Sequence, residues 1–99
     1  DNAIKTFEKL IQHLINSKVE IVFILTPYHH RVWSHTDQPI VKAFNIIESK
    51  VHDIAKEYKI KVIGSYHPND IGCLKNEFFD SMHPMDTCLM KLERKIVKY

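Results

Sequence analysis

Val19 to Leu25 reads Val-Glu-Ile-Val-Phe-Ile-Leu and sets the fold class of this 99-residue chain. The stretch is apolar almost throughout and does not alternate between apolar and polar residues. Alternation would indicate a strand with one solvated face, whereas a continuous apolar run indicates a strand that helices cover on both faces. Thr26-Pro27 ends the strand. The stretch therefore predicts an α/β protein with a parallel sheet.

Amphipathic helices are predicted on both sides of this strand. Apolar residues recur at three- and four-residue spacing from Asn2 to about Ser17, and again from Asp37 to about Tyr58. A short second strand is predicted at Ile60–Ile63, with Gly64 at its end, and a last helix from Pro84 to about Lys98. Strand, helix and strand make a βαβ unit, so the two strands should be parallel.

The predicted order is αβαβα, which leaves the sheet incomplete. Two parallel strands expose both edges and give the apolar helix faces too little to pack on. We therefore expect one α/β domain over residues 1–99 that is the C-terminal fragment of a larger domain. The upstream part of the same protein, or another chain, would complete the sheet. The start at Asp1 rather than Met agrees with this expectation.

Composition excludes several classes of protein. The chain is 44% hydrophobic and 26% charged, with 2 Gly and 4 Pro, which is typical of a globular domain. Its net charge of +2 comes from interspersed basic and acidic residues, and this argues against nucleic acid as a partner. No stretch reaches the ~18 apolar residues of a membrane-spanning helix, and no signal peptide is visible. The sequence assigns no compartment.

The two cysteines, Cys73 and Cys88, are too few for a disulfide framework. Cys88 falls on the apolar stripe of the last predicted helix, which favours a buried thiol. Cys73 lies in the loop between the second strand and that helix. A single bridge is compatible with the sequence but not implied by it, so the redox compartment stays open.

Phe78 to Pro84, Phe-Phe-Asp-Ser-Met-His-Pro, carries a candidate acid/base pair. Asp80 lies three residues before His83, so in a tight turn its carboxylate can accept a hydrogen bond from Nδ1–H of the imidazole. Nε2 would then be unprotonated and face outward, as a general base requires. Pro84 at the first helical position would put His83 at the positive end of the helix dipole, which opposes protonation. The alternative is a helix cap by Asp80 or Ser81, with His83 merely polar.

This Asp-x-x-His turn, with the preceding strand, polar loop and closing helix, resembles the C-terminal block of SGNH hydrolases, the GDSL esterase/lipase superfamily. The resemblance covers about Val19 to Tyr99. It implies a three-layer, flavodoxin-like parallel sheet, of which this chain is the C-terminal half. It also implies that His83 and Asp80 complete a Ser-His-Asp triad. The family's Gly-Asp-Ser block is absent from this sequence, so the nucleophile would lie upstream.

The implied function is the acid/base part of a serine esterase or O-acyltransferase that acts on an ester, or on an acylated carbohydrate or lipid. The resemblance implies no cofactor and no metal, and the chain by itself should be inactive. Pro-Tyr-His-His after the first strand is similar to bacterial SGNH-like proteins that handle acyl groups on cell-surface polymers. By that similarity Tyr28, His29 and His30 are candidate substrate-binding residues.

The loop from Tyr28 to Asp37 would lie beyond the carboxyl end of the first strand, where ligands bind in open α/β sheets. It could instead be inert, with Trp33 folded back on the core and the histidines solvated. A second alternative is a zinc site, although no zinc-motif spacing is present; its candidate ligands are His29, His30, His35, His67, His83, Asp80 and Asp37. A third is a non-catalytic α/β interaction domain.

Overall fold

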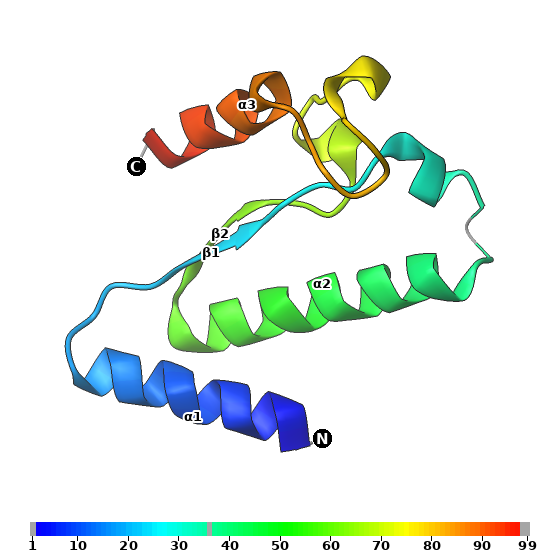
Figure 1. Cartoon of the computed structure of the whole chain (residues 1–99). Helices are drawn as coiled ribbons and strands as arrows, with labels where there is room; N and C mark the ends of the chain where they lie inside the picture. Colours follow the sequence, from blue (N-terminus) through cyan, green and yellow to red (C-terminus); the bar gives the residue numbers. More distant parts are fainter. Residues whose placement is uncertain (1, 36, 98–99) are drawn as a thin grey trace.

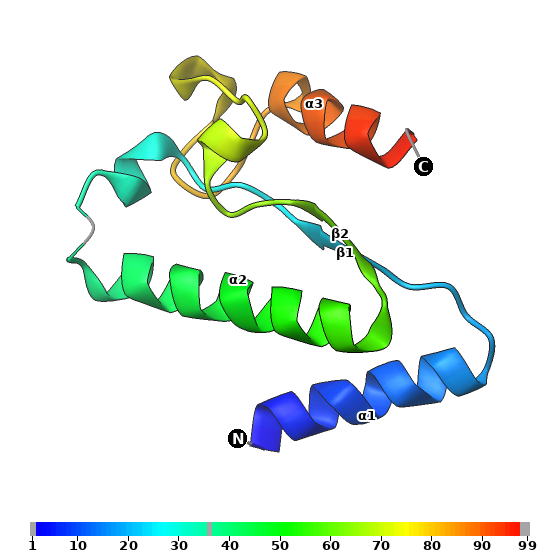
Figure 2. The same cartoon turned by 180° about the vertical axis from the view of Figure 1, so that it is seen from behind.

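The structure is a computed structural model that describes residues 2–35 and 37–97, with side chains up to residue 95. The elements along the chain are α1 (Asn2–Asn16), β1 (Val22–Leu25), the 3-10 helix η1 (His30–Trp33), α2 (Pro39–Tyr58), β2 (Lys61–Gly64), the 3-10 helices η2 (Pro68–Asp70) and η3 (Lys75–Glu77), and α3 (Asp86–Val97). Figure 1 shows the two strands running between α2 on one side and α3 on the other. The view from behind in Figure 2 agrees, with α1 lying beyond α2.

β1 and β2 form one parallel pair, with Val22 opposite Lys61 and Leu25 opposite Gly64. α2 connects the two strands, so the predicted βαβ unit is confirmed. β1 is shorter than predicted, because residues 19–21 precede the first pair of the ladder. The prediction that helices cover this strand on both faces is also wrong, since Val22 and Ile24 are exposed.

The predicted three-layer, flavodoxin-like sheet is wrong. The helices and strands follow the expected αβαβα order, but the described residues contain three α-helices and a single sheet of two strands. Two strands of four residues each cover roughly 13 Å by 5 Å. An α-helix with its side chains is about 10 Å wide, so this pair is too narrow to form the middle layer of such a fold. The described part of the chain is mainly helical.

Helix α1 is loosely attached to the rest of the structure. The Phe7 ring lies 5.6 Å from the Phe23 ring of β1, and Gln12 Nε2 donates to the Tyr58 hydroxyl 3.1 Å away. Ile11 is the residue of α1 that is buried, whereas Leu10 and other apolar residues of its predicted buried stripe are exposed. The radius of gyration is 14.8 Å, against about 13 Å for a compact chain of this length.

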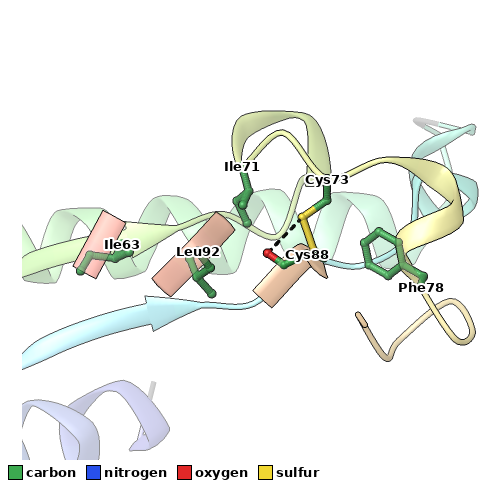
Figure 3. Close-up of a cluster of buried hydrophobic side chains, with 6 residues drawn as sticks. All are labelled: Ile63, Ile71, Cys73, Phe78, Cys88 and Leu92. Carbon is green, nitrogen blue, oxygen red and sulfur yellow. Dashed lines mark hydrogen bonds between the residues drawn. A yellow bond between two sulfur atoms is a disulfide. The ribbon is translucent and has the colours of Figure 1, made fainter. Parts of the chain in front are cut away.

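The core lies at the other end of the molecule, between β2, the loop that follows it and α3. Figure 3 shows its six buried side chains: Ile63, Ile71, Cys73, Phe78, Cys88 and Leu92. Cys88 is fully buried, as predicted. The prediction of a thiol there is wrong, because Cys73 and Cys88 form a disulfide. The bond ties the loop to the first turn of α3.

The disulfide should contribute substantially to stability, because it closes a loop whose ends lie 15 residues apart. The chain-entropy argument gives about 3 kcal/mol for a loop of this length. We expect reductant to lower the free energy of unfolding, measured by urea denaturation, by about this amount. The double variant Cys73→Ser/Cys88→Ser should show the same loss without reductant and no further change with it. A wild-type stability that is insensitive to reductant would contradict the role assigned to the bond.

Gly64 allows β1, β2 and α3 to approach one another closely. Its φ is +90°, and a Cβ atom there would lie 2.2 Å from the Leu25 carbonyl oxygen and 2.8 Å from Leu92 Cδ1. Both distances are shorter than van der Waals contact, and one of the atoms belongs to the backbone. A side chain at this position would therefore push the strands apart or displace α3.

Gly72 provides a matched control for this effect, because its φ of +86° is similar but no atom lies within 4 Å of a built Cβ. We expect Gly72→Ala to cost about 1–2 kcal/mol, from the backbone conformation alone. Gly64→Ala should cost at least about 2 kcal/mol more, because steric overlap adds to the same backbone term. Thermal or urea unfolding of both variants measures the difference. Equal losses would mean that the close approach of the strands is not what Gly64 provides.

Candidate active site

The segment from Phe78 to Pro84 forms a tight turn that its own backbone closes. Phe78 and Pro84 form an antiparallel bridge, and the N–H of Phe79 donates to the His83 carbonyl at 2.8 Å. Inside the turn, the N–H of Met82 donates to Asp80 Oδ1 at 2.8 Å. An aspartate that accepts from the backbone two residues ahead stabilises a turn in the manner of an Asx-turn. The position of the Asp80 carboxylate is thus set by local bonds.

The predicted hydrogen bond between His83 and Asp80 is present. His83 Nδ1 lies 2.8 Å from both Asp80 carboxylate oxygens. Because a carboxylate can only accept, Nδ1 carries the proton, and in the neutral ring Nε2 keeps its lone pair. Nε2 has no hydrogen-bond partner within residues 2–35 and 37–97. The His83 side chain is 70% exposed and that of Asp80 59%, so the pair lies open to solvent. Its catalytic role stays a prediction.

The same contacts keep Asp80 ionised. The hydrogen bond from the Met82 N–H and then that from His83 lower the pKa of Asp80 below its usual range. A carboxylate that remains charged at neutral pH can orient the imidazole and stabilise its protonated form.

The start of α3 differs from the prediction, and this affects both the helix-dipole argument for His83 and the predicted alternative of a helix cap. α3 begins at Asp86 rather than at Pro84, and Pro84 belongs to the bridge with Phe78. The effect of a helix dipole falls off beyond the terminal turn, so the dipole is not placed to act on His83 as expected. Asp80 and Ser81 lie five or more residues before Asp86, so neither occupies the N-cap position of α3. The bonds of Asp80 instead shape the turn.

His29 links the loop after β1 to this turn. Its N–H donates to the Ser81 carbonyl at 2.9 Å. Its ring Nδ1 accepts from the Arg31 N–H at 2.9 Å, so Nε2 carries the proton and donates to the Lys75 carbonyl at 3.1 Å. Because both ring nitrogens are used, His29 holds the loop in place and presents no free nitrogen to a substrate or metal.

Tyr28 belongs to a cluster of aromatic rings and is half-buried there. Its ring stacks on Phe44 at 4.4 Å, and its N–H donates to the Tyr66 carbonyl at 3.0 Å. Trp33 packs against Phe44 at 5.7 Å and against His67 at 4.8 Å. The inert-loop alternative placed Trp33 on the core, but Trp33 packs instead in this half-buried aromatic cluster, which is not part of the six-residue core. Tyr28 supports the base of the loop, and its predicted contact with a substrate stays a prediction.

His30 lies beside His29 at a surface depression. Its Nδ1 is buried and has no hydrogen-bond partner in the described part of the chain. Burial lowers the pKa of His30, an interaction with the Asn69 side chain acts the other way, and the nearby charges of His29, Lys75 and His67 lower it further. His29 and His30 are therefore not simply solvated, as the inert-loop alternative expected, whereas His35 is exposed.

The depression measures about 450 Å³, and its lining residues are His29, His30, Arg31, Ser34 and Lys75. Neither Arg31 nor Lys75 was predicted from the sequence as a site residue. Lys75 lies 46 positions from His29, so no motif spacing signals their proximity.

No serine in the described residues donates to His83. Ser34 Oγ donates to the Arg31 carbonyl at 2.6 Å, and the buried Ser65 donates to Glu48 at 3.0 Å. Within residues 2–35 and 37–97, no three histidine, cysteine, aspartate or glutamate side chains are grouped as a metal site requires. The zinc alternative therefore gains no support from the arrangement of these side chains.

Comparison of the chain with protein-family models, curated proteins and solved structures found no match. The resemblance to SGNH hydrolases therefore stays a prediction that rests on the residues quoted above. Among the helices that the structure describes, none has both the length and the apolar composition needed to cross a bilayer.

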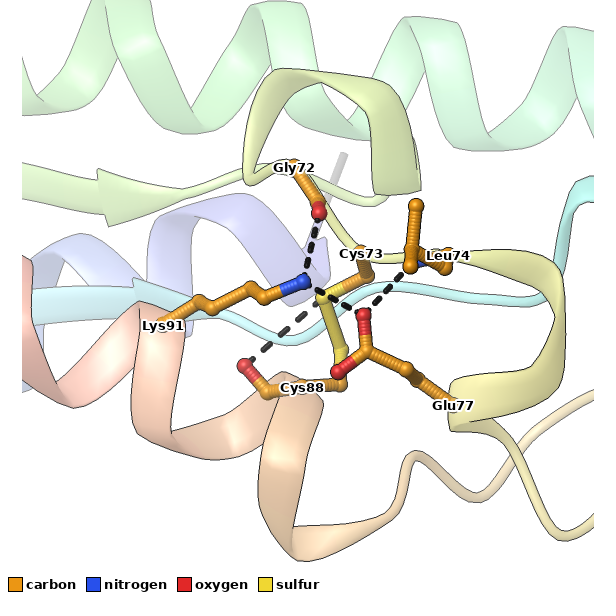
Figure 4. A network of polar contacts seen from close by, with 6 residues as sticks. All are labelled: Gly72, Cys73, Leu74, Glu77, Cys88 and Lys91. Carbon is orange, nitrogen blue, oxygen red and sulfur yellow. Dashed lines mark hydrogen bonds and ion pairs between the residues drawn. A yellow bond between two sulfur atoms is a disulfide. The ribbon is translucent and has the colours of Figure 1, made fainter.

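Glu77, just before the Phe78–Pro84 turn, is linked to Lys91 on α3, as Figure 4 shows. Its Oε1 accepts from Lys91 Nζ at 2.5 Å and from the Leu74 N–H at 2.8 Å. Its carbonyl accepts from the Met85 N–H at 2.8 Å, while Lys91 also donates to the Gly72 carbonyl at 3.0 Å. The hydrogen bond from Lys91, and then that from Leu74, lower the pKa of Glu77 from 4.5 to about 2.

This lowered pKa predicts acid sensitivity. A carboxylate with a depressed folded-state pKa stabilises the fold fully above its unfolded-state pKa, here about 4.5, and loses that contribution as the pH falls toward 2. Between pH 5 and 2 the free energy of unfolding should therefore fall more steeply in the wild type than in Glu77→Gln. Lys91→Met removes the main cause of the shift and should also flatten the profile. Three identical pH profiles from urea unfolding would contradict the assignment.

Proposed function

We propose that this chain supplies the histidine–aspartate half of a serine-dependent site that hydrolyses an ester or transfers its acyl group. The observation that carries the proposal is the pair of 2.8 Å contacts from His83 Nδ1 to the Asp80 carboxylate. These contacts leave Nε2 as the basic nitrogen on an exposed ring. A general base needs this tautomer, and it also needs access to the proton that it removes.

In the proposed reaction, His83 Nε2 takes the proton from a serine hydroxyl as the serine oxygen attacks the ester carbonyl. The imidazolium then gives this proton to the oxygen of the leaving alcohol, and an acyl-serine remains. Asp80 holds the ring and stabilises its positive charge throughout. Water or an acceptor hydroxyl completes the turnover by the reverse proton transfers, with His83 again as base. The substrate would be an ester or an acylated carbohydrate or lipid.

The serine would come from the upstream part of the same protein or from another chain. Two features support such a covering segment. The acid/base pair is largely exposed, and Phe79 and Met82 beside it are 74% and 62% exposed. Apolar residues of α1 and β1, including Leu10, Val22 and Ile24, are also exposed. By itself the chain should show no esterase activity, since a base without a nucleophile does not form the acyl intermediate.

A non-catalytic interaction domain is the second candidate function. The exposed apolar residues of α1 and β1, including Leu10, Val22 and Ile24, favour it. Large exposed apolar surfaces commonly mark protein interfaces. This function would need no chemistry from His83, so the two candidates differ in a measurable way.

The test uses the native-length protein and a fluorophosphonate probe that labels activated serines. We expect one serine to be labelled, and the labelling rate to fall by about 10²–10⁴-fold in His83→Ala and to a similar extent in Asp80→Asn. His52→Ala is the matched control, because His52 is an exposed histidine on α2 with a carboxylate, Glu48, 3.9 Å away. It should be labelled like the wild type.

Two outcomes of this experiment would contradict the proposal. One is the absence of any labelled serine in a folded wild-type protein, which would favour the interaction domain. The other is full labelling of His83→Ala, which would mean that His83 does not activate the labelled serine. Circular dichroism of each variant establishes that the fold is intact.

A further inference from the structure

The depression beside η1 is lined by basic groups. Of its five lining residues, Arg31 and Lys75 are cationic, His29 and His30 are imidazoles, and none is acidic. Neither the Arg31 nor the Lys75 side chain forms an ion pair or hydrogen bond with another described residue. By contrast, Lys91 and Lys95 on α3 both donate to groups of the neighbouring loop. The cations at the depression are therefore not neutralised by the described part of the chain.

One side chain joins the backbone segments that carry these two cations. The His29 ring accepts from the backbone N–H of Arg31 and donates to the backbone carbonyl of Lys75. Ser34 fixes the same short helix, since its Oγ donates to the Arg31 carbonyl at 2.6 Å. These contacts use only the backbones of Arg31 and Lys75. Both charged side chains remain available to a ligand, on a backbone that is already ordered.

Two like charges at one concave site repel each other, and an anion bound between them relieves that repulsion. A guanidinium group matches the oxygens of a phosphate with paired N–H donors, while an ammonium group adds a point charge. The pKa of His30 can be used to detect an anion in the depression. Burial and the surrounding positive charges now lower the pKa of His30, so an anion in the depression should raise it.

We propose that the depression formed by His29, His30, Arg31, Ser34 and Lys75 binds the phosphate group of a ligand. The phosphate could belong to a soluble phosphomonoester or to a lipid headgroup, which present the same chemistry to Arg31 and Lys75. The proposal does not depend on the acyl chemistry at His83. Loss of serine labelling would leave it intact, and absence of phosphate binding would leave the triad proposal intact.

The first arm titrates the native-length protein with inorganic phosphate and then with glycerol phosphate, and follows the ring signals of its histidines by NMR. We expect saturable shifts at His30 and a higher His30 pKa in the presence of phosphate. Arg31→Ala and Lys75→Ala should each weaken binding by about tenfold or more. Lys9→Ala is the charge-matched control on α1, and it should bind like the wild type. Arg31→Lys keeps the charge but not the paired donors, so its loss should be smaller.

The second arm uses vesicles of phosphatidylcholine with or without phosphatidic acid. Co-sedimentation that requires phosphatidic acid and is lost in Lys75→Ala but kept in Lys9→Ala would support a lipid as the source of the phosphate. Saturable binding of glycerol phosphate without co-sedimentation would support a soluble ligand. Phosphate shifts that do not saturate, or equal weakening in Lys9→Ala and Arg31→Ala, would overturn the proposal. Because neither cationic side chain has an ion pair or hydrogen bond to lose among the described residues, both alanine variants should fold. Lys75→Ala serves alone if Arg31→Ala does not fold.

Discussion

The attachment of the loop between Ile71 and Phe78 to α3 is the constraint on which the rest of the structure depends. The Cys73–Cys88 bond joins the two segments covalently, inside the six-residue core. Glu77 and Lys91 add a largely buried ion pair beside it. The two-stranded sheet is too narrow to organise a core of its own. Both links connect this loop to α3, whose Leu92 packs in the same core as Ile63 of β2.

The candidate active site is built on this attachment. The turn that holds Asp80 and His83 leaves the loop at Phe78 and returns to it at Pro84, and Phe78 is itself a core residue. The bond from His29 to the Ser81 carbonyl then joins the turn to the loop after β1. The exposed turn is thus held at its base by the buried Phe78 and its bridge to Pro84, and at Ser81 by the hydrogen bond from His29. Such support is what the positioning of a general base requires, which is the role proposed for His83.

The disulfide also bears on the compartment of the protein. Stable disulfides are typical of oxidising environments such as the cell exterior or the bacterial periplasm. An extracytoplasmic site would suit a protein that acts on acylated carbohydrate or lipid at a cell surface. A cationic depression next to such a site would suit a phosphate-bearing substrate or surface, which connects the two proposals without making either depend on the other.

By itself the sequence determined the features that depend on neighbouring residues. The order of helices and strands follows from local apolar periodicity, and the bond between Asp80 and His83 follows from a spacing of three residues in a turn. Each was predicted correctly because the interacting groups are close along the chain. The start of α3 was missed even at this level, because the bridge between Phe78 and Pro84 keeps Pro84 out of the helix.

Tertiary structure alone decided the extent of the sheet, the disulfide, and the partners of the residues after β1. The continuous apolar run at Val19–Leu25 indicated a strand covered on both faces. Hydrophobic residues are more stable when buried, but their presence does not mean that the fold provides a layer to cover them. His29 and Lys75 meet across 46 residues, and Cys73 and Cys88 across 15. The geometry of such contacts depends on how whole elements pack, and no local pattern in the sequence records it.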